Sequence, residues 1–163
     1  IMAIEYGDGS NSNTGRIIQV VTGNRVSVFS TTSSSFTDIG LSASITPKES
    51  ASKILIFLTI YMSSNDNSSQ RLLRGSTVIE AGTGSGSASR GFGGGFFCGS
   101  DADVMGQSGT FIDSPNTTSA TTYKVQALVG GGGTVFFGRD KTGSTNSQHT
   151  RSIQRITLME VAV

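Results

Sequence analysis

Cysteine is almost missing from this sequence, and charged residues and long apolar runs are scarce as well. Cys98 is the only cysteine in 163 residues, which excludes an internal disulfide and a cysteine-based zinc site. Charged residues make up 14% of the chain, against about 25% in typical globular domains. With 12 basic and 11 acidic residues, the formal net charge of +1 gives no long-range attraction to nucleic acid or to an anionic membrane surface. Serine, threonine, glycine and asparagine replace the charges, as is common in extracellular proteins and rigid assemblies.

No apolar run approaches the length of about 20 residues that a membrane-spanning helix needs. The longest run, residues 54–62, has the length of a strand. The first ten residues lack the basic and apolar segments of a signal peptide, and we interpret residues 1–15 as a linker or shaft-connecting segment. Residues 16–163 suffice for one domain and are too few for two ordinary ones. We therefore expect a single domain without membrane insertion.

Apolar residues recur with a period of two along most of the chain, and no window shows the 3.6-residue period of a capped helix. We count about eight strands at the spacing typical of a sandwich or barrel, which predicts an all-β antiparallel sandwich. We expect a hairpin turn at Gly23-Asn24 and a turn or bulge at Gly75-Ser76. Four segments rich in small polar residues are predicted linkers: 63–69, 82–95, 99–121 and 139–151.

The segment 54–62 is apolar on both faces. Its even-numbered positions are all large and apolar, and its other face carries Leu55, Phe57 and Tyr61. A strand of this kind is expected to be covered on both sides. We interpret one side as the sandwich core and the other, with Phe57 and Tyr61, as core or a subunit interface.

The glycine-rich stretch GSGSASRGFGGGFFCG raises the question of a phosphate-binding loop. Neither glycine series has a third glycine at the dinucleotide spacing, no Gly-Lys-Ser/Thr follows, and no helix is predicted after it. We interpret it as a loop leading into a short strand at Phe96-Phe97. Arg90 and Phe92 have the longest reach in it, which makes it a candidate for the exposed end of the domain or for packing between subunits.

The other chemical motifs are incomplete. DADVMG, with Asp101 and Asp103, resembles the start of a calcium loop but lacks its later ligands and flanking helices, so we expect no metal and no cofactor. His149 lacks a serine on a nucleophile elbow. Among the glutamates, Glu80 and Glu160 near strand ends form a weak candidate for a glycosidase pair. The arginines and lysines are scattered, without the basic cluster of a nucleic-acid interface.

Polar loops on a rigid sandwich commonly hold sugars or protein receptors. Several predicted loops carry asparagine, aspartate and arginine, and we take them as candidate receptor-binding loops. The candidate residues are Asn65, Asp66, Asn67, Arg90, Phe92, Asp101, Asp103, Asn116, Arg139, Asp140, Lys141 and Asn146.

Three segments carry a resemblance to a known family. They are TDIGLSASITPKESASKILIFLTIYMSS, RLLRGSTVIEAG and the ending RSIQRITLMEVA. Together they resemble the C-terminal domains of tail-fibre and related virion proteins of tailed bacteriophages, of the kind found in marine and freshwater phages. The shared features run from about residue 37 to the C-terminus and are strand patterns, with no catalytic residues to transfer.

The resemblance implies a jelly-roll-like sandwich that forms a homotrimer at a fibre tip or on the virion surface. The function expected from it is a non-enzymatic, extracellular virion domain that contacts other virion proteins and binds a host-surface glycan or protein receptor. A capsid decoration or a purely structural fibre cap or trimerisation domain is the first alternative. A glycan depolymerase is the second.

Overall fold

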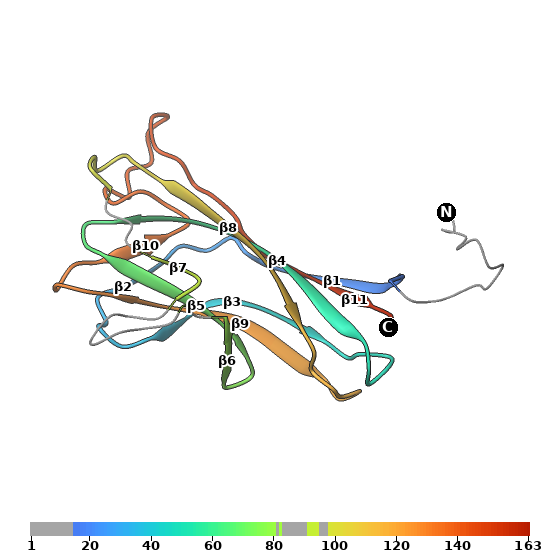
Figure 1. Ribbon diagram of the computed structural model, residues 1–163. Coiled ribbons are helices and arrows are strands. Elements are labelled where there is room, and N and C mark those ends of the chain that lie inside the picture. The colour runs from blue at the N-terminus through green and yellow to red at the C-terminus, as the bar shows by residue number, and fades with distance from the viewer. Residues whose placement is uncertain (1–14, 81, 83–90, 95–97) are drawn as a thin grey trace.

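The computed structural model describes residues 15–80, 82, 91–94 and 98–163 and has two antiparallel β-sheets packed face to face (Figure 1). Sheet A has the order β1-β11-β4-β10-β2, with β8 on the other edge of β4. Its strands are β1 (Ile17–Arg25), β2 (Phe29–Thr31), β4 (Lys53–Ser64), β8 (Met105–Asp113), β10 (Val135–Phe137) and β11 (Gln154–Val161).

Sheet B has the order β3-β9-β5-β6, and β7 pairs with β5 beyond the end of β6. Its strands are β3 (Thr37–Ile45), β5 (Ser68–Arg74), β6 (Thr77–Glu80), β7 (Gly93–Gly94) and β9 (Thr121–Val129). All regular elements of the described residues are strands, so the predicted all-β antiparallel sandwich is confirmed.

The core lies between the two sheets and follows from the alternation of the strands. Successive side chains of a strand point to opposite faces, and the even-numbered residues of β4 from Ile54 to Met62 all point inward with at most 1% exposure. They pack against the inward residues of β9, Tyr123, Val125 and Ala127, which are fully buried. The period of two expected along most of the chain is therefore confirmed for these two strands.

One row of side chains across the outer face of sheet A is apolar and is not covered by the described part of the chain. Val20, Met159, Leu55 and Ile112 stand side by side across β1, β11, β4 and β8, and we call them the outer apolar row. Val20 is 53% exposed and Ile112 is 65% exposed. Phe57, the next residue of β4 on the same face after Leu55, is 40% exposed. The second face of β4 is thus uncovered by the described part of its own chain.

Three expectations about strands need correction. The described residues form eleven strands rather than about eight. The segment 99–121, expected to be a linker, contains β8, which pairs with β4 along nine residues. Its glycines and serines hide the strand because pairing comes from the backbone, and an edge strand needs few apolar side chains.

The hairpin turn expected at Gly23-Asn24 is also wrong, because β1 continues through both residues and pairs with β11. Gly23 serves a different purpose there. A Cβ atom at Gly23 would lie 1.9 Å from the carbonyl oxygen of Ser42, so glycine permits β1 to approach β3 closely. Gly75-Ser76 does form the connection between β5 and β6, with Gly75 at φ +58°.

Residues 1–14 of the expected linker, Arg90, and the strand expected at Phe96-Phe97 lie outside the described residues. The chain becomes described at Gly15, whose amide donates to the carbonyl of Ala162 at 2.8 Å. The N-terminal side of the domain and its C-terminus therefore share one end of the sandwich (Figure 1).

One side chain joins two strands that run end to end along β4. β11 pairs with β4 up to Thr59, and β10 pairs with it from Met62 onward. Gln154 bridges the gap: its Oε1 accepts the Tyr61 amide at 2.7 Å and its Nε2 donates to the Tyr61 carbonyl at 3.1 Å. The Gln154 side chain thereby replaces a backbone partner, and Gln154 is fully buried.

We expect Gln154→Ala to lower the free energy of unfolding by roughly 2–4 kcal/mol, because it removes a buried side chain, leaves the Tyr61 amide without its partner and removes one of the donors to the Tyr61 carbonyl. Urea unfolding followed by circular dichroism measures the change. Gln148→Ala, in an exposed loop, is the matched control and should stay within about 0.5 kcal/mol of the parent. Equal stability of the two variants would contradict the bridging role.

Candidate functional site

Four connections gather at the end of the sandwich opposite the termini (Figure 1). We call this the loop end; it comprises residues 65–67, 98–104, 130–134 and 138–153. Two hydrogen bonds join the connections 65–67 and 130–134. The Gly130 amide donates to the Asn67 carbonyl at 2.7 Å, and the Thr134 amide donates to the side-chain Oδ1 of Asn65 at 2.6 Å. The candidates Asn65 and Asn67 are thus partly used to hold the two turns in register.

Asp66 packs against the glycine-rich turn at residues 130–133. A Cβ at Gly131 would lie 2.0 Å from its Oδ2, and a Cβ at Gly133 would lie 2.3 Å from its Cβ. Gly131 also has φ +62°. Glycine is therefore required in this turn both by backbone conformation and by the closeness of the Asp66 side chain.

Asp140 is the organising residue of the loop 139–151. It is 1% exposed, and its Oδ1 accepts the Gly143 amide at 2.7 Å and the Thr142 hydroxyl at 2.9 Å. Its Oδ2 contacts His149 Nδ1 at 2.5 Å. Burial by itself raises the pKa of Asp140, but the bonds from Gly143, His149 and Thr142 outweigh burial and the net pKa is lowered. The carboxylate therefore stays ionised and fastens both ends of the loop.

The contacts of the His149 ring hold the loop together and do not have the arrangement of a proton relay. In a Ser–His–Asp relay the carboxylate and the nucleophile contact opposite ring nitrogens. Here Asp140 and the Thr142 hydroxyl, which lies 3.0 Å away, both contact Nδ1. The geometry suits holding the loop closed, with the imidazole side chain 13% exposed.

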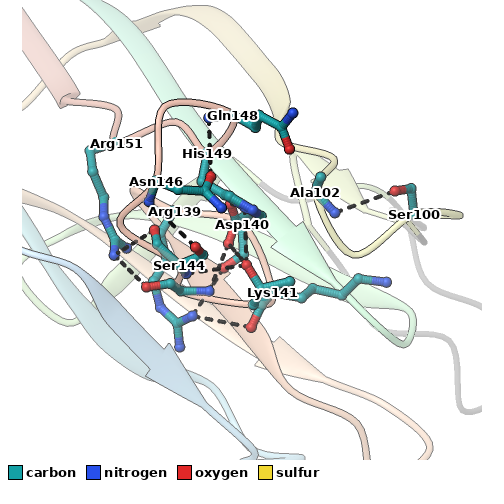
Figure 2. A network of polar contacts seen from close by, with 12 residues as sticks. Ser100, Ala102, Arg139, Asp140, Lys141, Ser144, Asn146, Gln148, His149 and Arg151 are labelled. Carbon is teal, nitrogen blue, oxygen red and sulfur yellow. Dashed lines mark hydrogen bonds and ion pairs between the residues drawn. The ribbon is translucent and has the colours of Figure 1, made fainter.

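Two arginines flank the same loop (Figure 2). Arg139 Nη1 donates to the carbonyls of Asp140 and Lys141 at 3.1 Å each, and its guanidinium lies 4.2 Å from the centre of the Phe136 ring. Arg151 Nη2 donates to the Gly143 carbonyl at 2.7 Å. The backbones of Arg139 and Arg151 form a β-bridge, which sets the two side chains beside each other at the base of the loop.

Lys141 ties this loop to the connection before β8. Its Nζ lies 3.0 Å from Asp101 Oδ1 and donates to the Cys98 carbonyl at 3.0 Å, and its amide donates to the Asp101 carbonyl. Asp103 Oδ2 accepts the Ser100 amide at 2.9 Å. The two aspartates of the calcium-like motif therefore serve separate local contacts. Nowhere in the described ranges do three or more histidine, cysteine, aspartate or glutamate side chains gather as metal ligands.

The structure brings some of the predicted candidates together and separates others. Nine of the twelve lie at the loop end: Asn65, Asp66, Asn67, Asp101, Asp103, Arg139, Asp140, Lys141 and Asn146. Asn116 lies between β8 and β9 at the opposite end, with φ +51°. Phe92 is half-buried against the core and meets Phe111 edge-on at 5.4 Å, which suits packing rather than contact with a receptor. Arg90 lies outside the described residues.

Glu160 has a structural role at the end of the sandwich near the termini. Its Oε1 accepts hydrogen bonds from the amides of Lys48 and Glu49 at 2.8 and 3.2 Å, and its Oε2 accepts one from Gln19 Nε2. Burial alone raises the pKa of Glu160, but the hydrogen bonds from Gln19 and from the two amides help to lower it overall. The Glu80 side chain lies outside the described part, so the proposed glycosidase pair stays a prediction.

Sequence reasoning missed the partners of Asp140. The sequence indicates no partner for His149, and no motif points to Thr142 or Arg151. The only signal was the presence of one histidine and several small polar residues within a dozen positions of Asp140. Spacing within an irregular loop does not fix which side chains meet, so this signal was too weak to predict the pair.

In comparisons with known proteins, no family model matches the chain, and no curated protein matches it. Among the residues that the structure describes, there is no helix with the length and apolar character to cross a membrane.

We expect Asp140→Asn to destabilise the protein by about 1–3 kcal/mol near neutral pH, because a buried charged acceptor is lost. Since folding lowers the pKa of Asp140 below its ordinary 3.8, its stabilisation is present above that value and disappears as the pH falls through the folded-state pKa. The stability difference between parent and variant should therefore shrink from about pH 5 downward.

Urea titrations at successive pH values measure this difference. Asp101→Asn is the control, because the Asp101 side chain is 77% exposed and its pair with Lys141 should contribute less than about 1 kcal/mol. A gap between parent and Asp140→Asn that stays constant into acid would show that the carboxylate charge does not hold the loop.

Proposed function

We propose that the domain is a non-enzymatic virion domain, the C-terminal knob of a phage tail fibre, that binds a host-surface glycan through its loop end. The resemblance of the strand segments supports the virion assignment. The observation that carries the binding role is the position of the polar loops. They project from the end opposite the termini, where a preceding shaft would leave them outermost (Figure 1).

The loop end has the properties of a binding surface on a rigid scaffold. Its loops are fastened to β4 and to each other by Gln154, Asp140 and Asn65. Exposed positions of the same loops, among them Asn146 and Gln148, retain polar groups that point to solvent. Binding through preorganised loops loses less conformational entropy than binding through loose ones.

The proposal includes a homotrimer of jelly-roll-like domains. The outer apolar row and Phe57 support assembly, because adjoining exposed apolar side chains are typical of interaction surfaces. A purely structural role, as a capsid decoration or as a fibre-cap or trimerisation domain, is the second candidate. The same exposed face favours it, and it would need no receptor at all.

A glycan array tests the binding role. We expect the purified domain to bind a subset of bacterial lipopolysaccharides or capsular polysaccharides and to adhere to cells that carry them. Asp140→Asn, which loosens the loop, should weaken this binding more than Asn116→Ala at the opposite end. A domain that binds no glycan and no susceptible cell, while located on the particle by labelled electron microscopy, would favour the structural role.

Light scattering tests the assembly. We expect the mass of a trimer for the parent, and a shift toward monomer for Phe57→Asp, because a charge buried at an interface without a partner is costly. Ser42→Asp, on the exposed outer face of sheet B, should leave the mass unchanged. A monomer mass for the parent at high concentration would refute the trimer.

A further inference from the structure

Two cations at the base of the loop 139–151 lack an acidic partner. Within the described ranges, the ion pairs are made by Arg74, Lys124, Lys141 and His149. Neither Arg139 nor Arg151 is among them, and the nearest buried carboxylate, Asp140, is engaged by His149, Thr142 and Gly143. The positive charge of this pair of arginines is therefore not neutralised by the described protein groups.

The two guanidinium groups converge on one residue. A Cβ at Gly143 would lie 2.5 Å from Arg139 Nη1, and the Gly143 carbonyl accepts Arg151 Nη2 at 2.7 Å. The backbone bridge between Arg139 and Arg151 directs both side chains to the same face, since directly opposed residues of an antiparallel pair share a face. Figure 2 shows the two side chains running along the same side of the loop.

Each arginine uses only part of its donor set to hold the loop. A guanidinium has five N–H donors in a rigid fork. Arg139 uses Nη1 for two carbonyls, and Arg151 uses Nη2 for the carbonyls of Gly143 and Ser144. The remaining donors of Arg139 are Nε and Nη2, which form the two-donor edge that matches a carboxylate.

The arginine pair is also fixed before any ligand arrives. Arg139 lies against the face of Phe136, and its anchored Nη1 restricts rotation of the guanidinium plane. Stacking on an aromatic face leaves the edges of a guanidinium available for hydrogen bonds. An anion therefore meets donors whose side-chain entropy is already lost, which favours a planar, bidentate ligand over a diffuse counter-ion.

We propose that Arg139 and Arg151 form a binding site for the carboxylate of an acidic saccharide, such as a uronic acid residue. This inference rests on the proposed glycan-binding function and specifies its ligand class. The Nε–Nη2 edge of Arg139 receives the carboxylate, Arg151 adds a second positive charge, and sugar hydroxyls face the polar side chains of the loop. The φ of +66° at Gly143 favours glycine, and a side chain at this position would have to displace the Arg139 guanidinium.

The experiment is a calorimetric or NMR titration of the intact domain with galacturonate, galactose, galactose 6-phosphate and inorganic sulfate. We expect galacturonate to bind at least about tenfold more tightly than galactose, and more weakly as salt is added. Arg151→Gln should weaken galacturonate binding about tenfold or more. Arg139→Lys keeps the charge but loses the two-donor edge, and should weaken galacturonate binding while reducing its preference over sulfate.

Arg155→Gln is the matched control. Arg155 is an exposed arginine of β11 whose Nε donates to Asn24 Oδ1, and its loss should leave galacturonate affinity unchanged. Circular dichroism and melting temperature verify that each variant is folded. If a loop variant fails to fold, the comparison of galacturonate with galactose on the parent, with its salt dependence, still decides the question.

Each outcome has a defined meaning. Equal affinity for galacturonate and galactose, or unchanged affinity in Arg151→Gln, overturns the site. Tighter binding of sulfate or galactose 6-phosphate than of galacturonate overturns the assignment to a carboxylate. Binding of neutral glycans on the array without any response to galacturonate would leave the proposed receptor function standing and remove only this inference. Galacturonate binding without adherence to any glycan array or cell would support the site and remove the receptor role.

Discussion

The bridge between Gln154 and the backbone of Tyr61 is the constraint on which the loop end depends. β4 is the longest strand, and two separate strands, β10 and β11, share one of its edges. Where they meet, the β4 backbone would lose its partners inside the protein. A buried amide side chain supplies one donor and one acceptor in the place of a peptide group, so the edge stays paired without a continuous strand.

This joint also determines where the chain between β10 and β11 can go. Gly138, at φ +78°, donates to the Tyr61 carbonyl and accepts the Ser152 amide, so residues 139–151 leave and re-enter the sheet at nearly the same point. A loop with fixed ends can be closed by a single ionised group, and Asp140 does this from inside. The arginines then stand at the base of the loop, because the same joint aligns residues 139 and 151 as a bridge.

Each end of the sandwich contains a buried carboxylate that is held by hydrogen bonds. Glu160 at the terminal end and Asp140 at the loop end are both buried carboxylates satisfied by backbone amides and neighbouring polar side chains. Each remains ionised because these donors outweigh the cost of burial. Glu160 holds the turn at Lys48 and Glu49. Asp140 holds the loop 139–151, which carries Arg139 and Arg151.

Much of the fold could be predicted from the sequence. The period of two in the sequence runs through β3, β4, β9 and β11, because a strand that covers the core must present one apolar face. β8 could not be predicted because an edge strand is held by backbone pairing and needs few apolar side chains. The continuity of β1 through Gly23 could not be predicted either, because the glycine there is needed for the close approach of β3 and does not form a turn. Nine of the twelve candidate residues lie at the loop end; their role in binding stays a prediction, and their hydrogen-bond partners could not be predicted from spacing.

The sequence by itself determined the all-β class, the inward faces of the main strands, and the absence of a complete nucleotide or calcium motif, because these depend on local spacing. The tertiary structure decided that Gln154 would join two strands, that Asp140 would meet His149, and that Arg139 and Arg151 would stand together without an acidic partner. These contacts link residues whose separation is set by the course of loops and by pairing between distant strands. No local period records such distances, so only the folded chain defines them.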